Sequence, residues 1–460
     1  MSLHKQQPAH SSSIWIKNPR ACWTGNAQDA SNGLVIQGNK IIELVAAGAA
    51  PNSVYDYSFD ASNHVLLPGL INCHHHFYQT LTRALPGALN KELFPWLQAL
   101  YPVWSNLNDD AIFASTQLAL SELLLSGCTT AADHHYVFSS IMPHAIDAQV
   151  AAAKTIGTRV TLTRGSMSLG QSKGGLPPDS VVESDEKILS ESERLIDSYH
   201  DTSEDSFCKI ALAPCSPFSV TPDLMRATAV LAQQKDVLLH THLGETEDEN
   251  NFCLKQFGMR PVDYLDDVGW LNNRVWLAHG IHFNEEEIAR LGHACVGVCH
   301  CPTSNMLLAS GMCHTRDLQR AGAPVGLGVD GSASNDGSNM IQEVRQAMLL
   351  QKLRYGSANF THIDALKLAT SGSAKLLHRP ELGELAIGKK ADLALFSLNE
   401  PRFSGHGDPL AALILCGAHK ADYVMVAGEW KVKNGEMVDV DINDVMARHG
   451  VAAKRLREMV

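Results

Sequence analysis

Two segments of the chain place histidines at alternate positions directly after apolar runs. The first covers residues 68–76 and ends in three consecutive histidines, and the second covers residues 238–245. Alternate residues of a strand point to the same side, so His74 and His76 share one face and His75 faces away. Two neutral imidazoles on one face are able to grip a single metal ion. We therefore expect His75 to be structural.

The second segment supplies a further imidazole and a carboxylate. Its histidines are His240 and His242, and Glu245 follows three residues later at the start of a loop. His242 is the candidate metal ligand. Glu245 is a candidate proton shuttle, because acid/base catalysis needs a titratable group beside the reacting atoms. His240 is expected deeper in the fold, as a hydrogen-bonded core histidine.

Two more apolar runs end in residues that are able to do chemistry. Residues 275–279 end in His279, and residues 326–330 end in Asp330. A carboxylate that directly follows a buried strand is costly unless it is paired or bound to a metal. Asp330 is therefore a further candidate metal ligand.

The elements that must position these residues alternate along the chain. Apolar runs separated by helical periodicity predict eight strands in a closed, parallel (β/α)8 TIM barrel of the α/β class. The candidate metal ligands and catalytic residues then lie at the C-terminal ends of strands, the face on which barrel enzymes assemble active sites. The predicted strands cover residues 70–73, 129–133, 159–164, 209–213, 237–242, 275–279, 295–300 and 325–330, and the clearest helices cover 111–125, 146–156, 184–199 and 222–234.

Short β segments flank the predicted barrel on both sides. They cover residues 13–17, 33–37 and 40–45 before it, and 392–396, 423–426 and 431–433 after it. We expect the two ends of the chain to pack together as a small β-sandwich domain. The predicted division is 1–66 for the N-terminal part of the sandwich, 67–380 for the barrel, and 381–460 for the C-terminal part with a terminal helix over 442–457.

The order of these motifs resembles that of the amidohydrolase superfamily, in its branch of deaminases and triazine hydrolases. His-x-His, His-x-x-Glu, His and Asp follow the first, fifth, sixth and eighth strands. Residues 383–395 resemble the segment in which the chain of family members passes from the barrel back into the β domain. The resemblance covers nearly the whole chain. It implies a divalent metal on the ligand set His74, His76, His242 and Asp330.

The predicted fourth strand indicates how many metals to expect. Two-metal members of the superfamily bridge their ions with a lysine or an acid in the barrel, whereas residues 209–213 have their lysine at the far end. We therefore expect one metal. Three imidazoles and one carboxylate suit zinc, and iron or manganese accept the same ligands.

The resemblance also implies a role for each remaining residue. A metal-bound water has its pKa lowered toward ~7. Asp330 then accepts the water proton and His279 orients the attacking oxygen. Glu245 protonates the ring nitrogen of the substrate and helps to release ammonia.

Two residues beside the ligands bear on the substrate. Gln79 resembles a glutamine that pairs with the purine edge in guanine deaminases, and capping of a loop backbone is the alternative. Cys215 stands where those enzymes carry an arginine, so it opens space and removes a donor. The surrounding runs are most similar to the subfamily that hydrolyses 8-oxoguanine to uric acid and ammonia. Triazine or hydroxytriazine aminohydrolases and guanine or isoguanine deaminases are the alternatives.

Several other conspicuous side chains near the first motif are expected to be structural. Arg83 is expected in an ion pair. The aromatic residues Phe94, Trp96, Tyr101 and Trp104 are expected on a helix packed against the barrel rather than over the substrate.

The composition indicates a small-molecule partner. The formal charge is −12, and we find no basic stripe of the kind that binds nucleic acid. The chain has neither an apolar run of ~20 residues for a membrane span nor the apolar core of a signal peptide in residues 1–13, so we expect a cytoplasmic protein. The 11 scattered cysteines fit reduced thiols. The resemblance allows a homo-oligomer. A non-catalytic scaffold of the same fold is the rival from another class, and the intact ligand set argues against it.

Overall fold

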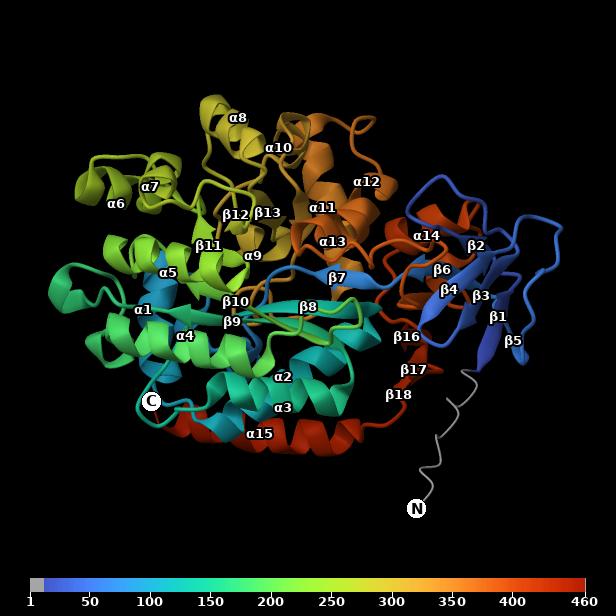
Figure 1. Cartoon of the computed structure of the whole chain (residues 1–460), viewed down its shortest axis with the longest axis horizontal. Coiled ribbons are helices and arrows are strands. Elements are labelled where there is room, and N and C mark those ends of the chain that lie inside the picture. The colour runs from blue at the N-terminus through green and yellow to red at the C-terminus, as the bar shows by residue number, and fades with distance from the viewer. Residues whose placement is uncertain (1–11, 460) are drawn as a thin grey trace, which may run out of the picture.

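The computed structural model describes residues 12–459, and its largest part is a barrel of eight parallel strands (Figure 1). The strands follow one another around the barrel in chain order, from β7 to β14. The predicted TIM barrel is therefore confirmed. Its strands are β7 (Leu70–Asn72), β8 (Cys128–His135), β9 (Arg159–Ser166), β10 (Cys208–Pro214), β11 (Leu239–Leu243), β12 (Val275–His279), β13 (Gly297–His300) and β14 (Val325–Leu327).

Backbone hydrogen bonds close the barrel between its first and last strands. Cys73 donates its N–H to Leu327 O over 2.9 Å, and Asp330 donates its N–H to His74 O over 3.0 Å. Both contacts lie where β7 and β14 give way to loops. Closure of the barrel therefore places the segment of His74 and His76 beside the segment of Asp330.

Seven of the eight barrel strands have ends that differ from those predicted, and β12 alone has the predicted bounds. β8 continues beyond residue 133 to His135, so its last residues reach the active-site end of the barrel. β13 begins at Gly297 rather than 295, because Cys295 has a left-handed φ of 54°. β14 ends at Leu327 rather than 330, because Asp330 has a φ of 63°, outside the range of extended backbone.

Two smaller sheets beside the barrel confirm the predicted β-sandwich. Their strand orders are β4-β3-β1-β5 and β18-β17-β16-β15-β6-β2. β6, which leads into β7, pairs with β15 in antiparallel register, so both ends of the chain share one sheet. A separate apolar cluster that includes Ile16, Leu34 and Leu393 fills the space between the sheets. The strands are β1 (Ser13–Lys17), β2 (Ala21–Cys22), β3 (Gly33–Gln37), β4 (Lys40–Leu44), β5 (Tyr57–Asp60), β6 (His64–Pro68), β15 (Leu393–Ser397), β16 (Tyr423–Val426), β17 (Glu429–Lys433) and β18 (Glu436–Met437).

A buried ion pair joins the sandwich to the barrel. Arg159, at the start of β9, donates from Nε to Asp392 Oδ2 over 3.0 Å, and both side chains are buried. Asp392 also accepts the N–H of Ala427 over 2.9 Å. Loss of either partner would leave a buried charge unpaired, so this contact ties the two parts of the molecule together.

Helices cover the outside of the barrel, and the last helix lies along the barrel rather than on the sandwich (Figure 1). This helix, α15, packs against α2 and against the short 3-10 segment η1 (Phe77–Thr82). His449 Nε2 lies 3.1 Å from Thr80 Oγ1, so α15 braces the segment that follows His76. The helices are α1 (Leu93–Trp104), α2 (Asp109–Leu125), α3 (Ala145–Ile156), α4 (Asp185–Tyr199), α5 (Pro222–Lys235), α6 (Glu247–Phe257), α7 (Pro261–Asp267), α8 (Glu285–His293), α9 (Pro302–Leu307), α10 (Thr315–Ala321), α11 (Met340–Tyr355), α12 (His362–Lys367), α13 (Ser373–Leu376), α14 (Pro409–Leu415) and α15 (Ile442–Glu458).

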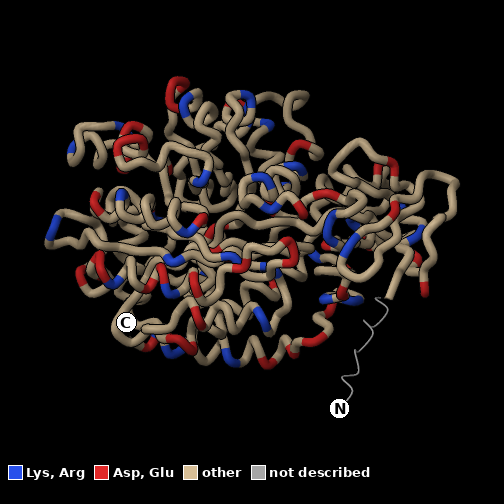
Figure 2. Tube along the Cα trace, in the orientation of Figure 1, with Lys and Arg blue, Asp and Glu red and all other residues tan. Residues whose placement is uncertain are grey.

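Acidic and basic residues are interspersed over the molecule in the view of Figure 2. Within residues 12–459, no helix combines the length and the apolar character needed to cross a membrane. The first eleven residues, on which the expectation about a signal peptide depends, lie outside the described range. The absence of nucleic-acid and membrane partners stays a prediction.

Candidate active site

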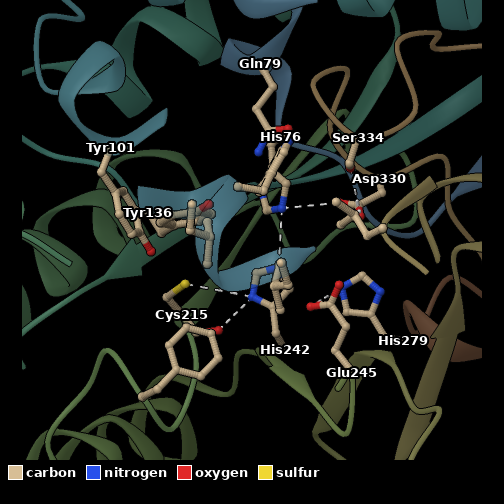
Figure 3. A pocket seen from close by; sticks show the side chains of 15 residues that line it. His76, Gln79, Tyr101, Tyr136, Cys215, His242, Glu245, His279, Asp330 and Ser334 are labelled. Atoms are coloured by element: carbon tan, nitrogen blue, oxygen red, sulfur yellow. Dashed lines mark hydrogen bonds and ion pairs between the residues drawn. The ribbon is translucent and has the colours of Figure 1, made fainter. Parts of the chain in front are cut away.

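A cavity opens at the C-terminal end of the barrel (Figure 3). This is the end at which barrel enzymes assemble their active sites. One side is polar and comes from strand ends, and the other is largely apolar and comes from α1 and neighbouring loops. The lining residues are His76, Gln79, Leu93, Trp96, Leu97, Tyr101, Tyr136, Cys215, Phe218, His242, Glu245, His279, Leu308, Asp330 and Ser334.

The four predicted metal ligands converge at the floor of this cavity. Asp330 Oδ1 lies 3.2 Å from His74 Nε2 and 3.3 Å from His76 Nε2. His242 Nε2 lies 3.3 Å from His76 Nε2. Ligand atoms 2.0–2.1 Å from a tetrahedral ion lie about 3.3 Å from one another. The spacing of these atoms therefore matches the spacing that a small divalent cation requires.

The opposite ring nitrogens of two of these histidines are bonded to main-chain carbonyls. His76 Nδ1 donates to His134 O over 2.6 Å, and His242 Nδ1 donates to Cys215 O over 2.7 Å. A neutral imidazole that donates from Nδ1 has a bare Nε2. Both rings thus turn an unprotonated nitrogen toward the same point, where bare lone pairs repel one another unless a cation lies between them.

Burial favours the neutral form of the His76 and His242 imidazoles, whereas the neighbours of Asp330 favour its ionised carboxylate. Burial lowers the pKa of His76 to about 3, with the neighbouring His74 adding to the effect. Burial opposes ionisation of Asp330, but the imidazoles beside it, His74 foremost, hold its pKa well below the usual value. Neutral imidazole and ionised carboxylate are the forms in which these side chains bind metals.

Glu245 and His279 lie together beside the ligands. Glu245 Oε2 is 3.4 Å from His279 Nε2, and both side chains are almost fully buried. Burial, and then the charges of Asp330 and Glu249, raise the pKa of Glu245 well above the usual value. These surroundings favour the protonated form of Glu245, the form from which a proton is donated.

Hydrogen bonds from behind fix the positions of both residues. The amide of Asn305 donates to His279 Nδ1 over 3.0 Å, so His279 carries its proton on Nε2, toward the cavity. Glu249, on α6, accepts the N–H of Gly244 over 2.8 Å and the N–H of Glu245 over 3.3 Å. The loop that carries Glu245 is thereby anchored to the following helix.

Two of the site residues adopt the left-handed backbone conformation. His279 has a φ of 78° and Asp330 has a φ of 63°. Such values are uncommon for residues other than glycine, and they persist where the surrounding structure enforces them. Each turn directs its side chain into the cavity at the point where its strand ends.

Gln79 and Cys215 both line the cavity, as predicted for residues that contact substrate. Gln79 Oε1 also accepts the N–H of Ala333 over 3.3 Å, so the alternative of a loop-capping amide holds for its oxygen. A Cβ on Gly331 would lie 1.9 Å from that oxygen, so any larger residue there would displace the Gln79 amide. Burial raises the pKa of the Cys215 thiol to about 12, which keeps it neutral.

The residues expected to be structural are placed as predicted, with two exceptions. His75 faces away from the ligands and bonds to Ser338 Oγ over 2.8 Å, and Arg83 pairs with Glu122. The aromatic residues do lie on a helix, α1, but Trp96 and Tyr101 of that helix line the cavity. The expectation that they only pack on the barrel is wrong for these two, because α1 lies across the mouth of the barrel.

Sequence reasoning missed several residues of the site, among them Tyr136 and Ser334 of the cavity wall and three residues that contact the predicted ones. His134 lies within 4.8 Å of His74, His76 and His242 through a ring nitrogen, and its ring stacks on His242 at 4.6 Å. Two adjacent histidines directly after a predicted strand were the available signal. Asn305 and Glu249 act through bonds to other segments, for which the sequence carries no local signal.

Comparison with known proteins agrees with this geometry. The model of the amidohydrolase family matches residues 65–431. The 8-oxoguanine deaminase of Pseudomonas aeruginosa is 59% identical, over 97% of this chain and 99% of that protein. Hydroxydechloroatrazine ethylaminohydrolase of Pseudomonas sp. (strain ADP) is 37% identical, over 81% of this chain and 79% of that protein.

Solved structures show the same fold. A triazine hydrolase variant superposes with a TM-score of 0.91 at 32% identity, over 96% of this chain and 99% of that one. Atrazine chlorohydrolase from Arthrobacter aurescens, complexed with zinc, superposes with a TM-score of 0.89 at 32% identity, over 96% of this chain and 100% of that one. The predicted class, a hydrolase that acts on C–N bonds, is confirmed, and the chain belongs to the amidohydrolase family.

Proposed function

We propose that the protein is a zinc-dependent deaminase that hydrolyses 8-oxoguanine to uric acid and ammonia. The proposed ligands are His74 Nε2, His76 Nε2, His242 Nε2 and Asp330 Oδ1. The observation that carries the proposal is the convergence of these ligand atoms, with the spacing expected around one small cation, beside a glutamic acid whose surroundings favour its protonated form. A divalent cation held there supplies Lewis-acid chemistry and lowers the pKa of a water molecule.

The chain's own residues supply the proton transfers. Asp330 accepts the proton of the attacking water. His279, protonated on Nε2 by virtue of Asn305, donates a hydrogen bond to the oxygen that adds to the ring carbon. Glu245 donates a proton to the adjacent ring nitrogen. The proton held by Asp330 passes to the exocyclic amine as the C–N bond breaks, and Glu245 regains a proton from the hydroxyl that becomes the carbonyl. The balance is one 8-oxoguanine and one water to one uric acid and one ammonia.

The choice of substrate depends on Gln79 and Cys215. Gln79 offers an amide at the wall of the cavity, which suits the amide-like edge of an oxidised purine. Cys215 offers a small neutral side chain where guanine deaminases carry an arginine, which would leave less space for the substrate ring. The 59% identity to the deaminase of Pseudomonas aeruginosa supports the same substrate.

Ammonia release from a panel of 8-oxoguanine, guanine, isoguanine, cytosine and hydroxytriazines tests this proposal. We expect 8-oxoguanine to give the highest kcat/KM, with uric acid as the product. Triazine hydrolysis is the second candidate, because the 37% identical relative and the superposed structures carry triazine-related names. A hydroxytriazine that outperforms every purine would overturn the choice of substrate. A protein that contains no metal by elemental analysis would instead favour the non-catalytic scaffold.

Three further expectations belong to the proposal. The sandwich is proposed to comprise residues 1–66 and 381–460, and the barrel residues 67–380, although β6 crosses the first boundary. A cytoplasmic location is supported by cysteines that are all free in the described chain. A homo-oligomeric state is proposed from the resemblance, and light scattering would test it.

A further inference from the structure

His240 lies beneath the metal site, behind His74. Its side chain is buried and its ring stacks on the indole of Trp276 at 4.2 Å, with 9° between the planes. Its two ring nitrogens have different partners. Nδ1 lies 2.8 Å from Trp276 O, and Nε2 lies 2.8 Å from His74 Nδ1.

These two contacts determine where the protons lie on both rings. A carbonyl oxygen only accepts, so Nδ1 of His240 carries a proton. A second proton on this ring would bury a charge among imidazoles, at a cost that no neighbouring carboxylate offsets. Nε2 of His240 therefore has a lone pair, which accepts the Nδ1–H of His74. His74 is left with a bare Nε2, which has no hydrogen-bond partner within the described residues.

We infer that His240 is a positioning residue, which holds His74 in the tautomer and orientation that direct its bare Nε2 at the metal. The inference rests on the proposed metal site. The other two histidine ligands are held by main-chain carbonyls, which no substitution at those positions removes. Among the three proposed histidine ligands, only His74 depends on a replaceable side chain. Hydrogen-bond partners of this kind typically change metal affinity 10–100-fold.

The test measures zinc affinity directly, by titrating the metal-free protein in competition with a chromogenic chelator. His240→Phe keeps the ring volume and the stacking on Trp276 but offers no acceptor, so we expect zinc affinity to fall about 10–100-fold. His240→Gln places an acceptor near the former Nε2, so we expect most of the affinity to return. His300→Phe is the matched control, because His300 is equally buried but contacts Gln351, at 3.2 Å, rather than a ligand.

The outcomes separate this inference from the proposed function. His240→Phe that binds zinc as tightly as the parent overturns the inference alone, and so do equal losses in the Phe, Gln and His300 variants. A parent protein that binds no zinc overturns both. If His240→Phe does not fold, His240→Asn makes the same test, because its shorter side chain keeps a donor toward Trp276 O but does not reach His74.

Discussion

The two walls of the cavity are built in different ways. On the metal side, His76 and Asp330 follow barrel strands and His242 lies within β11. Each of the three has a second contact that fixes its orientation. On the opposite side, Trp96 and Tyr101 come from α1, which is not part of the barrel's strand framework. The reaction chemistry is thus tied to the most rigid part of the fold, whereas the fit to the substrate depends on segments that vary more freely.

The largest effect is expected on the metal wall, the side of the cavity that carries the proposed ligands His74, His76, His242 and Asp330. His242→Ala removes one of four converging ligands, so we expect loss of both bound metal and activity. Elemental analysis and ammonia release on the same preparation check this. A variant that retains stoichiometric zinc and parental turnover would remove His242 from the ligand set.

The next effect separates catalysis from metal binding on the same wall. Glu245→Gln keeps the size of the side chain but cannot transfer the proton, so we expect kcat to fall about 10²–10⁴-fold. Zinc content is expected to stay at the parental level, because Glu245 is not a proposed ligand. Unchanged turnover would show that another group moves the proton.

A smaller effect is expected among the residues proposed to contact the substrate, of which Gln79 is one. Gln79→Met preserves the length of the side chain but removes its amide, so we expect KM for the purine to rise about tenfold, the value of one lost hydrogen bond of roughly 1.4 kcal/mol. Zinc content serves as the control. A loss of zinc in this variant would mean that substrate contacts and metal binding are not independent.

The smallest effect on activity concerns a carboxyl beneath the metal wall. Asp133 accepts the N–H of Phe77 over 2.6 Å and a donor of Gln149 over 2.7 Å, and burial raises its pKa to about 7. In the unfolded chain this pKa is about 4, so unfolding releases a proton between these values. The stability that Asp133 contributes is complete below about pH 4 and is lost as the pH rises through about 7.

Asp133→Asn removes this titration, and Gln149 is able to rotate its amide to match. The unfolding temperature of the variant, relative to the parent, should rise between about pH 4 and about pH 7 and then level off. Differential scanning calorimetry across this range measures the difference. A difference that does not change with pH would show that Asp133 is ionised throughout.

The sequence predicted the barrel and the metal wall because both leave a local signal. β12 has the predicted bounds, and His279 directly follows its apolar run. The substrate wall was predicted less well. The periodicity of α1 indicates a helix, but it does not reveal that Trp96 faces a cavity instead of the barrel. His134 was missed because the predicted strand ends at Asp133, whereas β8 continues to His135 and is buried along its whole length. The contacts of Asn305 and Glu249 exist only once distant segments have folded together.

The seam of the barrel has a consequence for how the protein matures. His74 and His76 follow the first barrel strand and Asp330 follows the last, and these strands meet where the barrel closes. During synthesis the two histidines emerge early and wait for their carboxylate partner until the final strand is made. The complete ligand set thus forms late, when the seam joins. A cation bound across it favours the closed barrel over any open one. A cation held by all four residues would therefore fasten the first strand to the last.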